Sequence, residues 1–442
     1  MIASRRSASQ AAFSVKVDAW IANALAGGCV DYATLLRRLP GVYPTEILFS
    51  LDRLAASGAV DPAFAAAARR QAKNANSPGA EGRSLLPPPH PLDFEWRFTA
   101  DASRALLNHA SALTPSGGDV LLFGTPGLAA EALTLPVGRR LALLAEANCV
   151  TDRLFALNRA IGSPLAIAFC TGGLPRESAD AVILDPPWYL DFVRPMLAAA
   201  AHACRVGGFV LISLPPDGAR PTAEADRQAA IALARRLGLA LVEHATLAIG
   251  YETPFFERNA LRAAGICTPP RWRRGDLAVF RKVRAPKQTS PSSQRTRLWS
   301  EVAVGRMRLF VRTTKAVQAG DAELVPIVAG DILPSVSRRD PRRALANVWT
   351  SGNRVFQTDN PQLLLEAAFL CAGEAMGSSI QPQLWGTVRE REVIERVAAE
   401  LRDLAALESM EETGSPTVME RSVAWKLNTT MSWNDSTATH FG

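Results

Sequence analysis

The stretch of sequence that decides the fold reads Ala181-Val182-Ile183-Leu184-Asp185-Pro186-Pro187-Trp188. Four apolar residues followed by a carboxylate and two prolines predict a buried strand that ends in a rigid turn. The prolines remove two N–H donors and restrict φ, so the carbonyl oxygen of Pro186 is expected to keep a fixed direction. Open parallel sheets bind their ligands outside the carboxyl ends of the strands. Residues 185–188 therefore mark a candidate site at such an edge.

The same kind of short apolar run recurs on both sides of this strand. Segments of helical pattern separate the runs, and this alternation predicts a doubly wound α/β fold with a mostly parallel sheet. Together with 181–184 the runs predict a seven-stranded, Rossmann-like sheet over residues 92–284. The other runs are 120–123, 141–145, 167–169, 209–213, 239–247 and 277–282.

Two changes in composition bound this α/β domain and predict exposed linkers at residues 71–91 and 285–296. Ahead of the domain, residues 14–70 have the pattern helix, helix, short turn, helix, which resembles a winged-helix module. Behind it, residues 297–409 predict a small α+β domain of unknown role, and residues 410–442 predict a flexible tail.

The N-terminal module has two interpretations. In the first, its third helix lies on DNA and Arg53, Arg37 and Arg38 bind phosphates. In the second, the module packs or dimerises, because the exposed side of the same helix also carries Glu46 and Asp52.

The composition predicts a soluble protein with a basic surface. The chain has 442 residues, 21% of them charged, and a formal net charge of +7. Positive charge favours a polyanion, so nucleic acid, either DNA or RNA, is the expected partner. No apolar run approaches the ~20 residues that cross a bilayer, and the first residues lack the apolar core of a signal peptide, which predicts a cytoplasmic protein. The cysteines are scattered singly, which predicts no metal site.

The tetrapeptide Asp185-Pro186-Pro187-Trp188, directly after a strand, resembles the motif of amino-methyltransferases in the class I S-adenosylmethionine-dependent superfamily, in particular the N6-adenine-like members. The resemblance covers residues 92–284 and implies methyl transfer to an exocyclic amine, most simply adenine N6 in DNA or RNA. It implies that Asp185 and the Pro186 carbonyl accept the two N–H bonds of the amine, and that Trp188 stacks on the base.

The cofactor that the resemblance implies is S-adenosylmethionine. Phe123, at the end of its strand, is a candidate contact of this cofactor. Gly124 and Gly127, which follow it, would let the backbone approach the methionine part of the cofactor. Glu146, directly after the next strand, would accept hydrogen bonds from the ribose hydroxyls. Pro126 removes a donor and stiffens a turn that is looser in the superfamily.

Aromatic and basic residues outside the tetrapeptide are candidates for contacts with the substrate. Aromatic side chains stack on bases, and arginines bind phosphates. The candidates are Tyr189, Tyr251, Phe255, Phe256, Arg273 and Arg274.

The altered glycine turn also suits a second function. A noncatalytic nucleic-acid-binding or assembly protein would keep the fold as a scaffold, since a fold alone does not prove activity. A partner protein would then bind through the N- or C-terminal domain. The sequence does not predict the oligomeric state.

The chain also resembles the branched-chain polyamine synthases, aminopropyltransferases that join an N-terminal winged helix to a class I domain with an Asp-Pro-Pro motif. That resemblance implies that Asp185 binds a polyamine amine and that the cofactor is decarboxylated S-adenosylmethionine. A polyamine favours several carboxylates. The acids near the motif are only Asp185, Asp191, Glu252 and Glu257, so the sequence favours nucleic acid.

Overall fold

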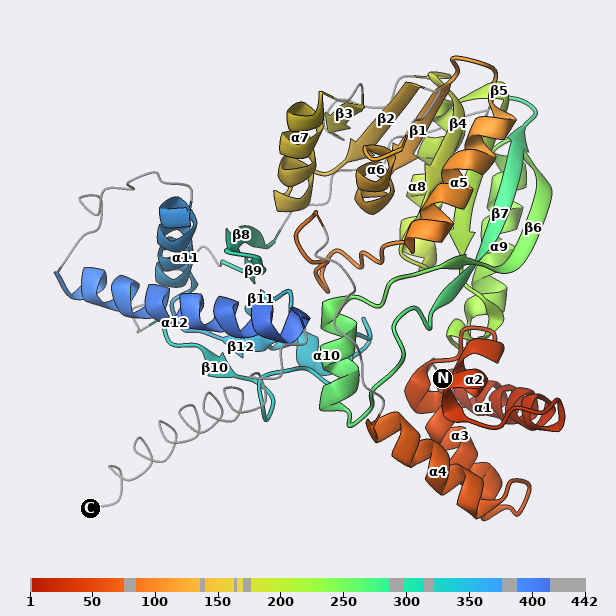
Figure 1. The fold of residues 1–442 in the computed structure, drawn as a ribbon, viewed down its shortest axis with the longest axis horizontal. Coiled ribbons are helices and arrows are strands. Elements are labelled where there is room, and N and C mark those ends of the chain that lie inside the picture. The colour runs from red at the N-terminus through yellow and green to blue at the C-terminus, as the bar shows by residue number, and fades with distance from the viewer. Residues whose placement is uncertain are drawn as a thin grey trace. The chain divides into compact units, whose positions relative to one another are not determined.

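The computed structural model describes residues 2–74, 85–135, 140–162, 165–169, 176–285, 298–313, 322–375 and 388–413. The chain divides into two compact units (Figure 1). The first unit comprises residues 1–76, 94–254 and 265–295, and the second comprises residues 77–93, 255–264 and 296–442. Within the described residues, no helix combines the length and the apolar character that a bilayer crossing requires.

The first unit contains a mostly parallel sheet of seven strands, as predicted, in the order β3-β2-β1-β4-β5-β7-β6. Strands β1 to β5 pair in parallel. Strand β7 lies antiparallel between β5 and β6, a reversal that the sequence does not signal. The strands are β1 (Asp119–Phe123), β2 (Arg140–Ala145), β3 (Ala166–Phe169), β4 (Ala179–Leu184), β5 (Cys204–Leu214), β6 (Leu239–Gly250) and β7 (Arg274–Lys282).

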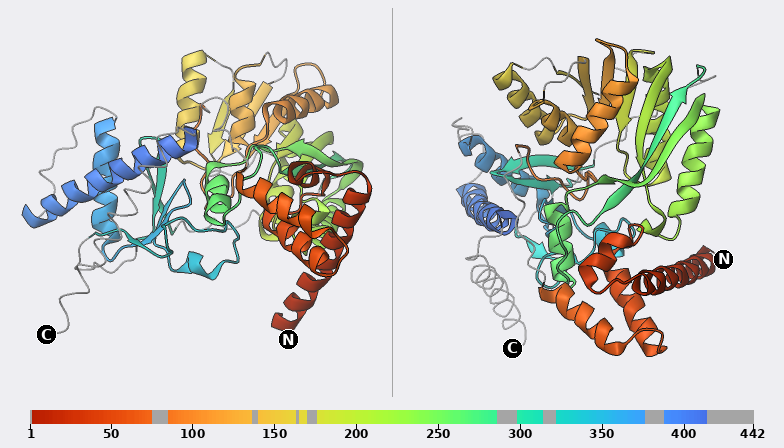
Figure 2. Two further views of the ribbon diagram at one scale, coloured as in Figure 1. Left: turned by 60° about the horizontal axis from the view of Figure 1, so that its bottom comes forward. Right: turned by 45° about the vertical axis from the view of Figure 1, so that its right-hand side comes forward.

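Helices cover both faces of this sheet (Figures 1 and 2). A helix that joins two parallel strands makes a right-handed crossover. The face that it covers therefore depends on the side of the first strand on which the second strand is added. Helices α8 and α9 pack apolar side chains such as Leu197 and Ile231 against Val182 and Val210 of β4 and β5. The helices of the unit's α/β part are α5 (Ala100–Leu113), α6 (Pro126–Ala132), α7 (Cys149–Ile161), α8 (Leu190–Ala203), η1 (Asp217–Ala219) and α9 (Ala223–Arg236).

The strand order reverses its direction between β1 and β4. From β1 the chain moves outward through β2 and β3 and then returns to add β4 on the other side of β1. Such a reversal leaves a crevice at the carboxyl ends of the two strands, where ligands bind. Phe123 pairs with Leu184 in this register, so residues 124–127 and 185–188 leave the sheet side by side.

The N-terminal part of the first unit consists of helices, and residues 2–74 contain no strand that could serve as a wing. The side chain of Asp31 caps the second helix by accepting from the Thr34 backbone N at 2.6 Å. Arg53 binds Asp18 at 2.7 Å, and Arg38 donates to the Gly27 carbonyl at 2.8 Å. Two of the three arginines that were expected on phosphates, Arg53 and Arg38, therefore already have internal partners, and the third, Arg37, donates to Thr34 Oγ1 at 3.4 Å. The helices are α1 (Ile2–Ala26), α2 (Tyr32–Arg38), α3 (Pro44–Ala56) and α4 (Pro62–Asn74).

The second unit combines an antiparallel sheet, in the order β10-β12-β11-β9-β8, with helices. Helix α12 continues to Thr413, so residues 410–413, expected to begin a flexible tail, are helical; the rest of that tail lies outside the described residues. The elements are α10 (Phe255–Ala263), β8 (Ser300–Val304), β9 (Met307–Val311), β10 (Val325–Pro326), η2 (Pro341–Ala344), β11 (Val348–Thr350), β12 (Val355–Gln357), α11 (Pro361–Ala375) and α12 (Val388–Thr413).

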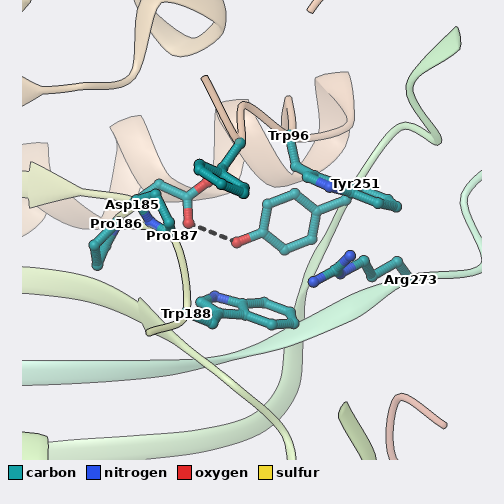
Figure 3. A pocket seen from close by; sticks show the side chains of 8 residues that line it. Trp96, Asp185, Pro186, Pro187, Trp188, Tyr251 and Arg273 are labelled. Atoms are coloured by element: carbon teal, nitrogen blue, oxygen red, sulfur yellow. Dashed lines mark hydrogen bonds between the residues drawn. The ribbon is translucent and has the colours of Figure 1, made fainter. Parts of the chain in front are cut away.

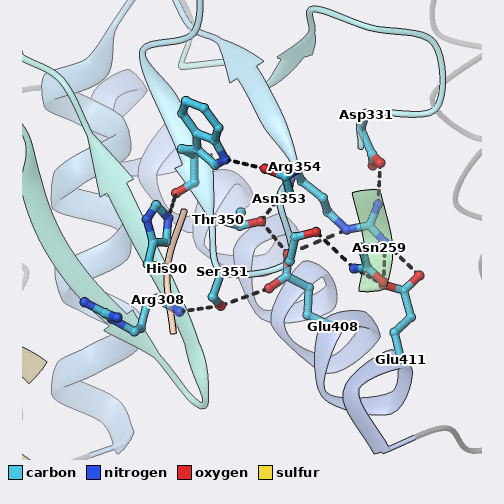
Figure 4. Close-up of polar contacts among 12 residues, drawn as sticks. His90, Asn259, Arg308, Asp331, Thr350, Ser351, Asn353, Arg354, Glu408 and Glu411 are labelled. Atoms are coloured by element: carbon cyan, nitrogen blue, oxygen red, sulfur yellow. Dashed lines mark hydrogen bonds and ion pairs between the residues drawn. The ribbon is translucent and has the colours of Figure 1, made fainter. Parts of the chain in front are cut away.

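A buried ionic network joins α12 to the sheet of the second unit (Figure 4). The side chain of Arg354 is 1% exposed and binds Asp331, Glu408 at 3.7 Å and Glu411 at 2.8 Å. Glu408 also accepts hydrogen bonds from the hydroxyls of Thr350 and Ser351. Burial raises the pKa of Glu408 to about 7, although Arg354 opposes this shift. A buried charge is tolerated only with partners of this kind.

Replacing Arg354 with Met is expected to lower the free energy of unfolding by about 3–5 kcal/mol, because three buried carboxylates lose their common cation. Thermal and urea unfolding of the full chain at pH 7.5 measure this change. The matched control is Arg396→Met on α12, where the exposed pair with Glu400 at 3.1 Å contributes about 0.5 kcal/mol or less. Equal effects of the two substitutions would contradict the expectation.

Candidate functional site

A pocket opens at the carboxyl end of β4, where the sequence predicts the site (Figure 3). The structure brings the tetrapeptide together with Tyr251, which follows β6, and with Arg273, which precedes β7. Phe94 and Trp96, ahead of α5, complete its wall. The lining residues are Phe94, Trp96, Asp185, Pro186, Pro187, Trp188, Tyr251 and Arg273.

A chain of hydrogen bonds ends on the carboxylate of Asp185. Tyr251 Oη donates to Asp185 Oδ1 at 2.8 Å, and Ser213 Oγ lies 2.5 Å from Tyr251 Oη. Trp188 Nε1 donates to Ser213 Oγ at 3.1 Å. Because the Tyr251 proton is directed to Asp185 and the indole can only donate, the Ser213 hydroxyl donates to Tyr251. Every donor in the chain thus points toward the carboxylate.

The surroundings of Asp185 perturb its ionisation. Burial raises the pKa of Asp185 to about 7, while hydrogen bonds from Tyr251 and Ser213 and the charge of Arg273 act in the opposite direction. Burial and the neighbouring Asp185 charge also raise the pKa of Tyr251 well above its usual range, so this hydroxyl keeps its proton. At neutral pH the carboxyl group is therefore divided between its charged and neutral forms.

Three aromatic rings surround the side chain of Arg273. The ring of Tyr251 stands at 82° to Trp188 and at 87° to Trp96, with centroids 5.7 and 6.3 Å apart. The guanidinium carbon of Arg273 lies 4.0 Å from the Trp96 centroid and 4.4 Å from the Trp188 centroid. The Trp188 ring packs against Gly275. A Cβ at position 275 would lie 2.8 Å from Trp188 Cζ2, so a larger residue would displace the ring.

The neighbouring strand ends carry the residues that were expected to bind a cofactor. Gly124 has φ +65° and a backbone N–H that donates to the Leu144 carbonyl at 3.0 Å. Thr125 is 5% exposed, and its hydroxyl has no hydrogen-bond partner within the described residues. Glu146 is exposed directly after β2, which pairs with β1. A left-handed turn, an unsatisfied buried hydroxyl and an exposed carboxylate suit a polar nucleoside ligand.

The other two residues predicted for the cofactor have packing contacts. Phe123 is the last residue of β1 and packs against the core. The side chain of Arg97 packs against Gly127. A Cβ at this position would lie 3.0 Å from Arg97 Cγ, which is closer than ordinary van der Waals contact. Arg97 is itself paired with Glu95 at 2.9 Å.

Four of the residues predicted to bind substrate do not line the pocket. Phe255 and Phe256 are buried on α10, which belongs to the second unit. Arg274 is exposed at the start of β7. Tyr189 precedes α8, and its ring contacts the guanidinium of Arg220 at 4.8 Å. Their roles in substrate binding remain predictions.

Sequence reasoning did not find Ser213 and Trp96. Ser213 is the polar residue near the carboxyl end of β5, and its position beside the strand of the motif is a usable signal. Trp96 precedes the first helix of the α/β domain and belongs to no motif, so only the tertiary fold shows that it lines the pocket.

No family model matches the chain, and no curated protein matches it in sequence. Among solved structures, the branched-chain polyamine synthase from Thermus thermophilus in complex with N4-aminopropylspermidine and 5'-methylthioadenosine is 16% identical and has a TM-score of 0.45. That match covers 64% of this chain and 92% of that chain.

Methyltransferases are also similar to this chain. One from Pyrococcus furiosus is 16% identical with a TM-score of 0.29 over 42% of this chain and 83% of that chain. A geranyl diphosphate methyltransferase in complex with S-adenosylmethionine is 14% identical with a TM-score of 0.30 over 42% and 85%. Because these TM-scores are below 0.5, the similarities assign no function to this chain.

Proposed function

We propose that the first unit transfers a methyl group from S-adenosylmethionine to an exocyclic amine, most simply N6 of adenine in DNA or RNA. The observation that carries this function is the position of Asp185 and its aromatic neighbours directly beside the turn at Gly124 and Thr125, across the reversal of strand order. A carboxylate for the amine and a polar turn for a nucleoside thus share one edge of the sheet.

Asp185 accepts an N–H bond of the amine, and the Pro186 carbonyl accepts the other. An amine conjugated to a purine ring is a weak nucleophile, and accepting its N–H bonds raises the electron density on nitrogen. As the nitrogen gains a fourth bond it becomes strongly acidic, and Asp185 takes the proton. Its raised pKa, about 7, makes this carboxylate a better base than an ordinary aspartate.

S-adenosylmethionine would supply an electrophilic methyl group on a sulfonium centre, and the electron pair of the broken methyl–sulfur bond would stay on the sulfur of the leaving S-adenosylhomocysteine. Glu146 would accept hydrogen bonds from the ribose hydroxyls, and the turn at Gly124 would bring the backbone close to the ligand. The buried hydroxyl of Thr125, unsatisfied within the described residues, gains a partner.

The charges in the pocket favour a nucleobase over a polyamine. Of the eight lining residues, one is a carboxylate, Asp185, and one is a guanidinium, Arg273. A polyamine carries several positive charges and would be repelled by Arg273, whereas a neutral base attached to a phosphate would be attracted. This balance supports methyl transfer to nucleic acid over aminopropyl transfer.

Isothermal titration calorimetry of the full chain with S-adenosylhomocysteine tests the cofactor. The wild type is expected to bind it, and Glu146→Ala is expected to lower the affinity about tenfold, the equivalent of one hydrogen bond to a charged group. The control Asp152→Ala removes an exposed carboxylate from the first turn of α7 and is expected to bind as the wild type does. Preference for decarboxylated S-adenosylmethionine would favour aminopropyl transfer, and binding of neither compound would favour the scaffold function.

Incorporation of labelled methyl groups into mixed DNA and RNA tests Asp185. Asp185→Ala is expected to lower the rate at least about a hundredfold, because the amine loses both its acceptor and its base. Unchanged incorporation would show that the acceptor is assigned wrongly.

The pH dependence of the same reaction tests Tyr251. The rate is expected to rise with pH through about 7, as Asp185 becomes ionised. Tyr251 donates to the charged form and so lowers the pKa of Asp185; Tyr251→Phe therefore moves this rise about one unit toward higher pH. Tyr32→Phe, which removes a buried hydroxyl in α2, is the control. A rise at the same pH in both variants would contradict a role for Tyr251.

A further inference from the structure

The side chain of Arg273 occupies the space between two indole rings in the pocket. In Figure 3 the guanidinium lies between Trp96 and Trp188. Its central carbon is 4.0 Å from the Trp96 centroid and 4.4 Å from the Trp188 centroid. Tyr251 stands nearly perpendicular to both indoles and closes a third side. We refer to this space, bounded by Trp96, Trp188 and Tyr251, as the aromatic slot.

The dimensions of the aromatic slot suit one flat group. Carbon atoms in contact lie about 3.5–4.0 Å apart, and the guanidinium is close to that separation from each indole. A second layer would not fit between the rings. A guanidinium and a nucleobase are both planar, and both stack on aromatic faces. The two groups therefore compete for the same volume.

The side chain of Arg273 can leave the slot without rearrangement of the backbone. The Arg273 carbonyl accepts a hydrogen bond from the Tyr251 backbone N at 3.1 Å, and the next residue, Arg274, pairs with Gly250 in the sheet. These bonds hold the main chain. Departure of the guanidinium requires rotation about side-chain bonds and exchanges its contacts with the two indoles for those of the incoming group.

We propose that Arg273 is a placeholder for the acceptor base, which enters the aromatic slot between Trp96 and Trp188 by displacing the guanidinium. This inference rests on the proposed function, and it names the acceptor's binding subsite. The exocyclic amine then faces Asp185 at the edge of the slot. The displaced guanidinium stays within reach of the ligand and pairs with a phosphate on the sugar that carries the base. Trp96 is a substrate-binding residue that acts as the second wall.

Calorimetry with adenosine and with adenosine monophosphate on the full chain tests this displacement. Arg273→Ala is expected to bind adenosine at least about fivefold more tightly than the wild type, because the slot is already vacant. The phosphate of adenosine monophosphate is expected to improve binding to the wild type but not to Arg273→Ala. Trp96→Ala is expected to weaken adenosine binding at least about tenfold. The matched control is Arg281→Ala, which removes an exposed arginine from β7, the strand that follows Arg273.

Two further measurements test the displacement even if the Arg273→Ala variant does not fold. Arg273→Lys keeps the charge and the aliphatic stem but not the planar head, and it is expected to bind adenosine more tightly than the wild type. Methylguanidine added to either variant is expected to compete with adenosine, since it refills the slot. Adenosine binding no tighter than in the wild type and Arg281→Ala, or no competition by methylguanidine, would overturn the inference.

Failure of the slot and failure of the proposed function give different results. If adenosine binding follows the expected pattern but the wild type incorporates no methyl groups into DNA or RNA, the slot stands and methyl transfer is wrong. If methyl groups are incorporated but Trp96→Ala and Arg273→Ala bind adenosine as the wild type does, methyl transfer stands and the placeholder is wrong.

Discussion

The parallel pairing of β1 with β4 is the constraint on which the candidate site depends. The register from Phe123 to Leu184 makes both strands end at the same level, so a turn with a left-handed glycine and a turn with two prolines leave the sheet together. Neither turn could supply both halves of a site alone. The prolines fix the direction of one backbone carbonyl, and Gly124 allows the other turn to lie close to a ligand.

The part of the fold that the sequence predicts is the part encoded by local pattern. Apolar runs of strand length between helical segments predict the seven-stranded sheet, and the position of Asp185 after such a run predicts its place at the sheet edge. The antiparallel insertion of β7 has no local signal, because it depends on which strands β7 pairs with. For the same reason, nothing local shows that the helix carrying Phe255 and Phe256 belongs to the second unit.

The residues of the candidate site also fall into two groups, those that local sequence predicts and those that only the tertiary structure shows. The tetrapeptide, Tyr251 and Arg273 were predicted from residue type and position, and all of them line the pocket. Ser213 and Trp96 were not, since their roles come from contacts between distant segments. The arginines give a further example: a positive net charge suggests a basic surface, yet Arg53, Arg308 and Arg354 have acidic partners within the fold. Composition counts charges, but only tertiary structure shows which of them are neutralised.

The polarity of the hydrogen-bond chain from Trp188 through Ser213 and Tyr251 has a consequence for product release. Tyr251 Oη already donates to Oδ1 of Asp185, so an incoming amine depends on Oδ2 and on the Pro186 carbonyl as its two acceptors. A primary amine has two hydrogens and satisfies both, whereas its methylated product has one. In the proposed reaction Asp185 takes one of the two amine protons, so after this proton has left the site the product has a single N–H for two acceptors, which weakens the hold on the product and favours one methyl group per nitrogen.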